Sequence, residues 1–194
     1  MDNNSNDNLD SISGKRKSKA PIISKIQEKI VIVADHQDAR IIYDNGYYGE
    51  LLKDKTLALN FDEALHLQER GVITIYDELG VNLAVGDCTK IFSERIPGFW
   101  KDYLVYKDLR NRGYIINRGI SNLVKYRLYP RGAKIGQDEA KTLICPLAEG
   151  KTINLENLDK IITQTQSLKK RLLIACVDRL GDVSYYELQG LFKS

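Results

Sequence analysis

In the first half of the chain, short apolar runs alternate with segments of helical period. The runs 29–34 and 72–77 are apolar and short, which predicts two buried strands. Asp35 and Asn60 are suited to cap two helices between these strands, and Glu63 lies where it would complete a capping box with Asn60. These elements predict a small α+β N-terminal domain.

The next stretch, residues 79–99, has no clear period, and a Pro-Gly pair marks a turn near its end. We place the domain boundary there, so that the N-terminal domain covers 22–99 and the C-terminal domain covers 100–194. Residues 1–21 are rich in Asn, Asp and Ser and predict a disordered tail. Its basic run, 15–19, could contact RNA phosphates, although a solvated charge run explains it more simply.

The second half has a more regular pattern. Trp100, Leu104 and Leu109 are expected to face inward from a first helix, and Asn154 is expected to cap a second, longer helix. The expected elements, in chain order, are a helix (100–113), three strands (114–117, 124–129 and 142–147), a helix after the cap, and two strands (172–178 and 183–188). The order α-β-β-β-α-β-β predicts one compact α/β domain on a mixed sheet.

Composition limits the class of protein more than it indicates a function. The 194 residues are 43% hydrophobic and 28% charged, an ordinary balance for a soluble globular protein, and the net charge of +3 permits a phosphate partner without indicating one. Cys88, Cys145 and Cys176 form no CxxC pair, so we expect reduced thiols in a cytoplasmic protein, with neither a metal site nor disulfides. The sequence has no long apolar stretch, so we expect no membrane partner.

Four motifs point to one family. In chain order they are Tyr47-Tyr48-Gly49, 106–114 (YKDLRNRGY), 126–132 (YRLYPRG), and 177–178 (VD) followed by 181–186 (GDVSYY). In this order and spacing they resemble the archaeal tRNA-intron splicing endonuclease family over about residues 28–190.

This resemblance implies a two-domain subunit, in which a restriction-nuclease-like α/β domain with a mixed sheet follows an α+β N-terminal domain. The family cuts precursor tRNA at bulge-helix-bulge elements, leaves 2′,3′-cyclic phosphate and 5′-OH ends, and uses no metal or other cofactor. In its site a tyrosine is assigned as the base, a histidine as the acid and a lysine as the electrostatic stabiliser. Attack by a ribose 2′-OH on the adjacent phosphate requires these three roles.

Two of the three family positions have matching residues. Tyr129, the last residue of the YRLY strand, matches the family tyrosine. Lys170, just before strand 172–178, best matches the lysine, although Lys169 and Arg171 flank it and leave the register open by one residue. Without the motifs, Tyr129 would be an aromatic residue at a strand end and Lys170 part of a basic helix C-terminus.

The family histidine has no counterpart. In the family it lies after the tyrosine in a His-Ser-x-x-Leu-Val-like context, and the corresponding stretch, 136–144, contains no histidine. The family position falls near Glu139–Lys141 instead. His36 and His66 are the only histidines of the chain, and we interpret both as structural or exposed.

The resemblance also implies an assembly surface. Some family members are heterotetramers of catalytic subunits and structural subunits, and the structural subunits lose catalytic residues while keeping the fold. In the family the final strand pairs with another subunit. The corresponding strand here is 183–188, which contains Tyr185 and Tyr186. An acidic loop before it docks on the opposite subunit, and loop 178–182 retains Asp182 as an acidic candidate.

The missing histidine makes a structural subunit the leading hypothesis, with a catalytic endonuclease subunit and precursor tRNA as partners. One alternative is a catalytic subunit that uses Glu139 or Lys141 as a replacement acid. Another is a stand-alone RNA-binding module with a relict nuclease fold. Cleavage of a bulge-helix-bulge RNA by this chain alone separates the first reading from the second, and co-purification from cells separates the first from the third.

Overall fold

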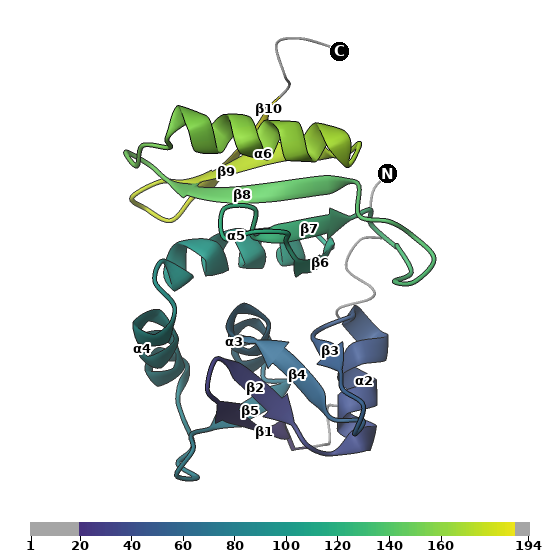
Figure 1. Cartoon of the computed structure of the whole chain (residues 1–194). Helices are drawn as coiled ribbons and strands as arrows, with labels where there is room; N and C mark the ends of the chain where they lie inside the picture. Colours follow the sequence, from purple (N-terminus) through teal and green to yellow (C-terminus); the bar gives the residue numbers. More distant parts are fainter. Residues whose placement is uncertain (1–19, 189–194) are drawn as a thin grey trace, which may run out of the picture. The chain divides into compact units, whose positions relative to one another are not determined.

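The computed structural model describes residues 20–188, and in this range the chain forms two compact units that are joined at Trp100 and Lys101 (Figure 1). The tail expected over 1–21, with its basic run, lies outside the described residues except for its last two positions. Each unit has its own mixed sheet and helices, so the expected α/β class is confirmed. In the described part of the chain, no helix is long and apolar enough to cross a membrane.

The N-terminal unit is built on one five-stranded sheet. Its elements are β1 (Ile22–Gln27), β2 (Ile30–Val33), α2 (His36–Gly46), β3 (Glu50–Leu51), β4 (Leu57–Asn60), α3 (Phe61–Glu69), β5 (Ile73–Tyr76) and α4 (Val85–Arg95). The strand order is β3-β4-β2-β1-β5, in which β1 and β5 run parallel and the other pairs are antiparallel.

The two helix caps expected in this unit are confirmed. Asp35 Oδ1 accepts two backbone N–H groups of the first turn of α2, at 2.9 and 3.0 Å. The Glu63 carboxylate accepts the N–H of Asn60 at 2.8 Å and also the N–H of Gly49 at 2.9 Å, which pairs this buried acid. Gly49 has a φ of 71°, and a Cβ on it would lie 2.5 Å from the carbonyl oxygen of Ala58, so only glycine fits this turn.

The segment without a clear sequence period contains helix α4. It buries only Cys88 and Phe92, and the Phe92 ring stacks on Phe61 at 3.9 Å. Because so few of its positions are buried, the helix does not show the regular spacing of apolar residues by which an amphipathic helix is recognised in a sequence. Strands β1, β3 and β4 were not predicted either: β1 directly follows the polar tail, β3 has only two residues, and β4 ends at Asn60, the cap of the helix that follows at once.

The C-terminal unit has a second five-stranded sheet. Its elements are α5 (Phe99–Asn111), whose first two residues belong to the N-terminal unit, β6 (Ile115–Arg118), β7 (Tyr126–Tyr129), β8 (Thr142–Ala148), α6 (Leu155–Ser167), β9 (Arg171–Val177) and β10 (Val183–Leu188). The strand order is β10-β9-β8-β7-β6, and only β8 and β9 run parallel, which confirms the expected mixed sheet. The first five residues of β8 are all buried, so this strand is covered on both faces.

One inward residue was wrongly predicted. Trp100 is 47% exposed, because α5 begins one residue earlier and Phe99 takes the inward position, 3% exposed and edge-on to Phe92 at 5.6 Å. Successive helix residues are rotated by about 100°, so the two aromatics cannot both face inward. Leu109 is buried as expected and Leu104 is half-buried.

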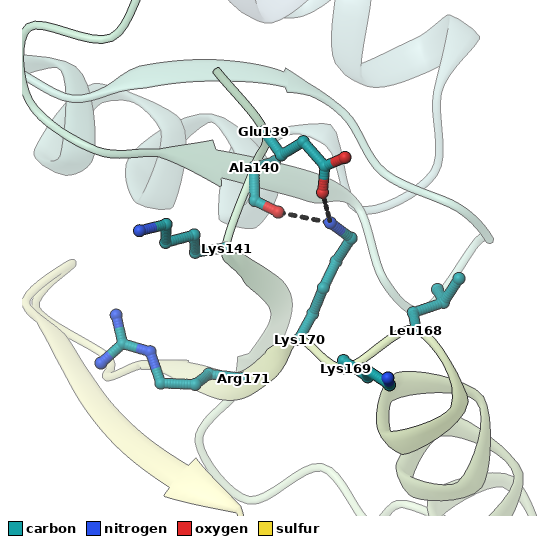
Figure 2. Close-up of a pocket in the computed structure, with 7 residues that line it drawn as sticks. All are labelled: Glu139, Ala140, Lys141, Leu168, Lys169, Lys170 and Arg171. Carbon is teal, nitrogen blue, oxygen red and sulfur yellow. Dashed lines mark hydrogen bonds and ion pairs between the residues drawn. The ribbon is translucent and has the colours of Figure 1, made fainter.

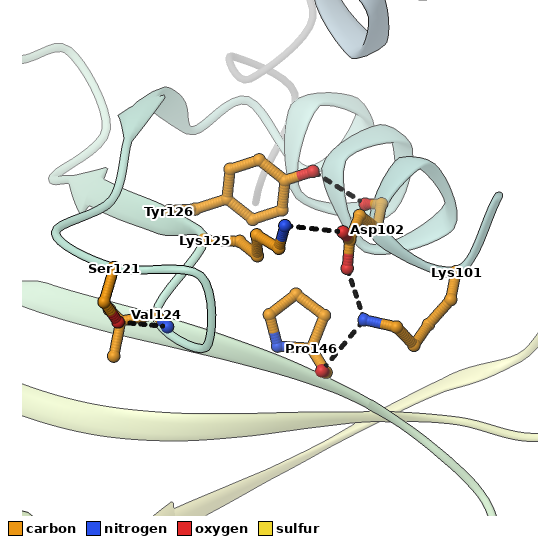
Figure 3. Close-up of polar contacts among 7 residues, drawn as sticks. All are labelled: Lys101, Asp102, Ser121, Val124, Lys125, Tyr126 and Pro146. Carbon is orange, nitrogen blue, oxygen red and sulfur yellow. Dashed lines mark hydrogen bonds and ion pairs between the residues drawn. The ribbon is translucent and has the colours of Figure 1, made fainter. Parts of the chain in front are cut away.

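An ionic cluster ties α5 to the sheet of the C-terminal unit (Figure 3). The buried Asp102 carboxylate pairs with the amines of Lys101 and, at 3.4 Å, Lys125. The Lys101 amine also donates to the carbonyl of Pro146 in β8 at 3.0 Å, and the Tyr126 hydroxyl in β7 donates to the carbonyl of Asp102 at 3.0 Å. A buried carboxylate is tolerated here because two amines compensate its charge.

Candidate functional site

Three segments of the sequence meet where β7 ends and where β8 and β9 begin, at one end of these neighbouring strands of the C-terminal sheet. Residue pairing aligns the end of β7 with the start of β8, and the start of β8 with the start of β9. The N–H of Lys141 donates to the carbonyl of Leu128 at 3.2 Å, and the carbonyl of Lys141 accepts from Arg171 at 3.0 Å. Tyr129 at the end of β7 and Lys170 just before β9 therefore lie at the same end of these neighbouring strands.

Tyr129 is mostly buried at this end of the strands. Its side chain is part of a small apolar cluster with Ala133 and Ala140, and the residue is 9% exposed. Tyr129 is not among the residues that line the pocket beside it. The structure thus places the candidate tyrosine next to the pocket and not in its wall.

The pocket itself has a volume of about 480 Å³ and is lined by residues 139–141 and 168–171, which we call the basic pocket (Figure 2). Four of its seven residues are Lys or Arg and one is Glu139. Side chains of this kind would attract an anion, so the pocket is basic despite the weak net charge of the whole chain.

Lys170 is the lysine whose amine contacts the other pocket residues Ala140 and Glu139. Its amine donates to the carbonyl of Ala140 at 2.5 Å and lies 3.8 Å from the Glu139 carboxylate (Figure 2). The Lys170 side chain is 19% exposed, whereas that of Glu139 is 90% exposed. Arg171 instead donates to the hydroxyl of Thr142 at 3.2 Å. The ion pair between Lys170 and Glu139 is solvated on the acid side and is therefore weak.

The two histidines belong to the N-terminal unit. His66 is buried in α3 and its ring stacks on Tyr48 at 6.1 Å, while His36 is the first residue of α2. Residues 101–194 contain no histidine. Among the described residues, no three His, Cys, Asp or Glu side chains are grouped so that they could hold a metal ion.

Strand β10 forms one edge of the C-terminal sheet. It pairs with β9 along its whole length, and on its other side no strand of residues 20–188 is paired with it. Its two tyrosines face different ways: Tyr186 is 61% exposed, while Tyr185 is half-buried. The exposed edge and the Tyr186 side chain are thus available for contact with another chain.

Tyr185 is held within its own chain. Its hydroxyl donates to Asp108 Oδ2 of α5 at 2.6 Å, and Arg112 donates to the same oxygen at 2.8 Å while lying 5.6 Å above the tyrosine ring. Burial, followed by the bond to the Asp108 carboxylate, raises the pKa of Tyr185. Tyr185 therefore fastens the edge strand to α5.

Replacing Tyr185 with phenylalanine is expected to destabilise the chain by about 1.5–3 kcal/mol, the range for a hydrogen bond to a charged group. Because folding raises its pKa above the ordinary value of about 10, the stabilisation is complete below about pH 10 and declines at higher pH, where the unfolded chain loses this proton first. Urea unfolding from about pH 8 to pH 11 measures both effects. Tyr186→Phe is the control, and an equal loss in both variants would contradict this role of Tyr185.

The loop between β9 and β10 is shaped by Asp178. Its Oδ1 accepts the N–H groups of Leu180 and Asp182 at 2.8 and 2.9 Å. Asp182 is exposed, and Leu180 at the tip is 90% exposed. The sequence drew attention to the acid, Asp182, but not to the leucine.

Both units match known protein domains. Residues 22–87 match the N-terminal domain of tRNA intron endonucleases, and residues 99–185 match their catalytic C-terminal domain. The tRNA-splicing endonuclease of Methanothermobacter thermautotrophicus is 30% identical over 162 residues, which cover 84% of this chain and 93% of that protein. The chain belongs to the tRNA intron endonuclease family.

Other relatives in this family differ in length. The tRNA-splicing endonuclease of Pyrococcus horikoshii is 34% identical over 77% of this chain and 85% of that protein. That of Methanococcoides burtonii is 35% identical over 76% of this chain but only 40% of that protein, so the chain spans less than half the length of this relative.

Proposed function

We propose that this chain is a structural subunit of a tRNA-splicing endonuclease. In this role it positions a catalytic subunit, in a heterotetramer, for the excision of introns from precursor tRNA at bulge-helix-bulge elements, leaving 2′,3′-cyclic phosphate and 5′-OH ends. The observation that carries the proposal is the lack of any histidine in residues 101–194, with Glu139 in the basic pocket at the family's histidine position.

Glu139 stands where the family pattern has its histidine. The pattern His-Ser-x-x-Leu-Val, aligned on Leu143-Ile144, puts Glu139 in the first position. An ionised carboxylate at this position has no proton to give to the leaving oxygen. It also places a solvent-exposed negative charge 3.8 Å from the lysine that would stabilise a phosphate in reaction, which opposes that role only weakly.

The edge strand β10 supports the assembly part of the proposal. β10 presents one side to solvent within the described residues, and strand addition by another subunit would pair its backbone groups. Tyr186 adds exposed aromatic surface on this strand, and the exposed Asp182 supplies a charge that favours specificity over affinity. Tyr185 supports this surface indirectly, through its bond to Asp108.

A catalytic subunit with a substituted acid is the competing proposal. Lys141 lines the same pocket as Lys170 and Glu139, although its amine points away from both of them (Figure 2). In this reading Tyr129 and Lys170 keep their family roles, and Lys141 or Glu139 donates the proton.

The test is cleavage of precursor tRNA by the purified chain alone, compared with the complex that co-purifies with it from cells. Loss of a positioned acid typically costs about 10²–10⁴-fold in rate, so the chain alone should cleave negligibly and the complex efficiently. Denaturing gels with a chelator present follow the reaction. Robust metal-independent cleavage by the chain alone would overturn the structural role and favour the competing proposal.

A further inference from the structure

The sheet of the N-terminal unit has two unlike faces. On one face the residues of β1, β2, β4 and β5 are all buried, and helices α2 and α3 contact β2, β4 and β5. Because side chains alternate along a strand, the residues between the buried ones lie on the opposite face. These residues are half-buried or exposed, and together with Glu50 and Leu52 we call them the open face.

Apolar side chains occupy the middle and both sides of the open face. Ile32 of β2 is half-buried in the middle, while Ile23 of β1 is 68% exposed and Leu52, just after β3, is 38% exposed. Leu52 belongs to this face because Leu51 before it pairs with the buried Leu57, and successive residues alternate. An exposed patch of this kind indicates a contact surface, as a single exposed residue does not.

Two opposite charges flank the middle of this face. The strand register sets Glu50 of β3 beside Ala58, Ala58 beside Ile32, and Ile32 beside Lys25 of β1. Lys25 and Glu50 are exposed, and neither side chain has an ion pair within residues 20–188. Three strand spacings, about 14 Å, separate them, so they cannot pair with each other in one copy.

The open face becomes complementary to itself under a two-fold rotation. Consider an axis parallel to the strands, between two stacked sheets and midway between β2 and β4. It places β1 of each copy opposite β3 of the other, so that Lys25 faces Glu50 twice. Ile23 lies two residues before Lys25 and Leu52 two residues after Glu50. Because β1 and β3 run in opposite directions, these two apolar side chains face each other as well.

We propose that two copies of this chain dimerise through their open faces, with Ile23 of each copy against Leu52 of the other and Lys25 against Glu50. Ile32 then faces the small side chain of Ala58, which leaves room for it between sheets stacked about 10 Å apart. The contact uses neither β10 nor the basic pocket. It goes beyond the proposed structural role, and its test measures mass instead of cleavage, so each can fail without the other.

Sedimentation equilibrium of the purified full-length chain at low salt tests the contact. The wild type is expected to form dimers, and Ile23→Asp is expected to lower the association constant at least about tenfold, because the symmetry removes two apolar contacts at once. Leu155→Asp is the matched control, since Leu155 is 79% exposed on α6 of the other unit. We expect less than about a twofold change for this control.

Charge reversal tests the symmetry itself. Lys25→Glu gives a face with two acids and Glu50→Lys a face with two lysines, so each variant alone should associate at least about tenfold more weakly than the wild type. An equal mixture should form heterodimers, because every acid of one variant then meets a lysine of the other. Lys90→Glu makes the same charge change on the exposed side of α4 and should have no effect.

The outcomes separate this contact from other ways of covering the face. Circular dichroism melts first verify that each variant is folded. A monomeric wild type would overturn the proposal and assign the open face to another occupant, such as residues 1–19 or a different chain. Association that Ile23→Asp leaves unchanged would place the contact elsewhere, at β10 for example. A mixture of the two charge variants that associates no better than either one alone would exclude the two-fold arrangement.

Discussion

Replacing Glu139 with histidine is expected to give this chain measurable metal-independent cleavage of precursor tRNA, at least about 10²-fold above its own background. The change supplies a proton donor where the family pattern has one and removes the carboxylate 3.8 Å from the Lys170 amine. Tyr129 and Lys170 already lie at the same end of strands β7 to β9 as this position. Initial rates on denaturing gels, with end-group analysis for 2′,3′-cyclic phosphate, measure the gain.

Glu149→His is the matched control for this experiment, because Glu149 is exposed just after β8, far along the strand from the pocket. Tyr129→Phe in the Glu139→His background should remove the gained activity if the tyrosine acts as the base. A Glu139→His chain that binds precursor tRNA without cleaving it would mean that more than the acid has been lost.

Deleting residues 183–194 is expected to abolish association with the catalytic subunit. The deletion removes the whole of β10, and with it both the exposed edge and the exposed Tyr186. It also removes six residue pairs with β9 and the bond between Tyr185 and Asp108, so we expect a large loss of stability as well. Size-exclusion chromatography with light scattering on the complex isolated from cells measures the assembly.

Point variants separate assembly from folding in this experiment. Asp182→Lys and Tyr186→Lys change exposed side chains, so both chains should stay folded while the larger complex weakens. A tetramer of unchanged mass with both variants would exclude the proposed assembly surface even if the deletion disrupts the complex, since the deletion alone could act through unfolding.

Local chemistry in the sequence predicted the elements that it controls directly. The carboxylates of Asp35 and Glu63 bond backbone N–H groups a few residues away, so the starts of α2 and α3 could be located from sequence alone. α4 could not, because its buried face consists of two residues. Trp100 was misplaced because either of two adjacent aromatics could begin the helix, and packing against Phe92 selects Phe99.

The candidate site depends on contacts that no local pattern contains. The pocket forms because β8 and β9 run side by side, which brings residues 139–141 next to residues 168–171. The adjacent tyrosines of β10 could be assigned to opposite faces from strand alternation. Which of them faces α5 depends on the strand's placement in the sheet, and the partner Asp108 lies 77 residues away in sequence.

The open side of β10 also affects what happens to a chain made without a partner. Its unpaired backbone groups, among the residues that the structure describes, accept any extended segment, including β10 of another copy or an unfolded chain. If the chain assembles with a catalytic subunit as proposed, an excess of this chain over that partner would favour aggregation through the uncovered edges. Balanced synthesis of the two proposed subunits would then be a condition for keeping the chain in solution, quite apart from any need of the reaction itself.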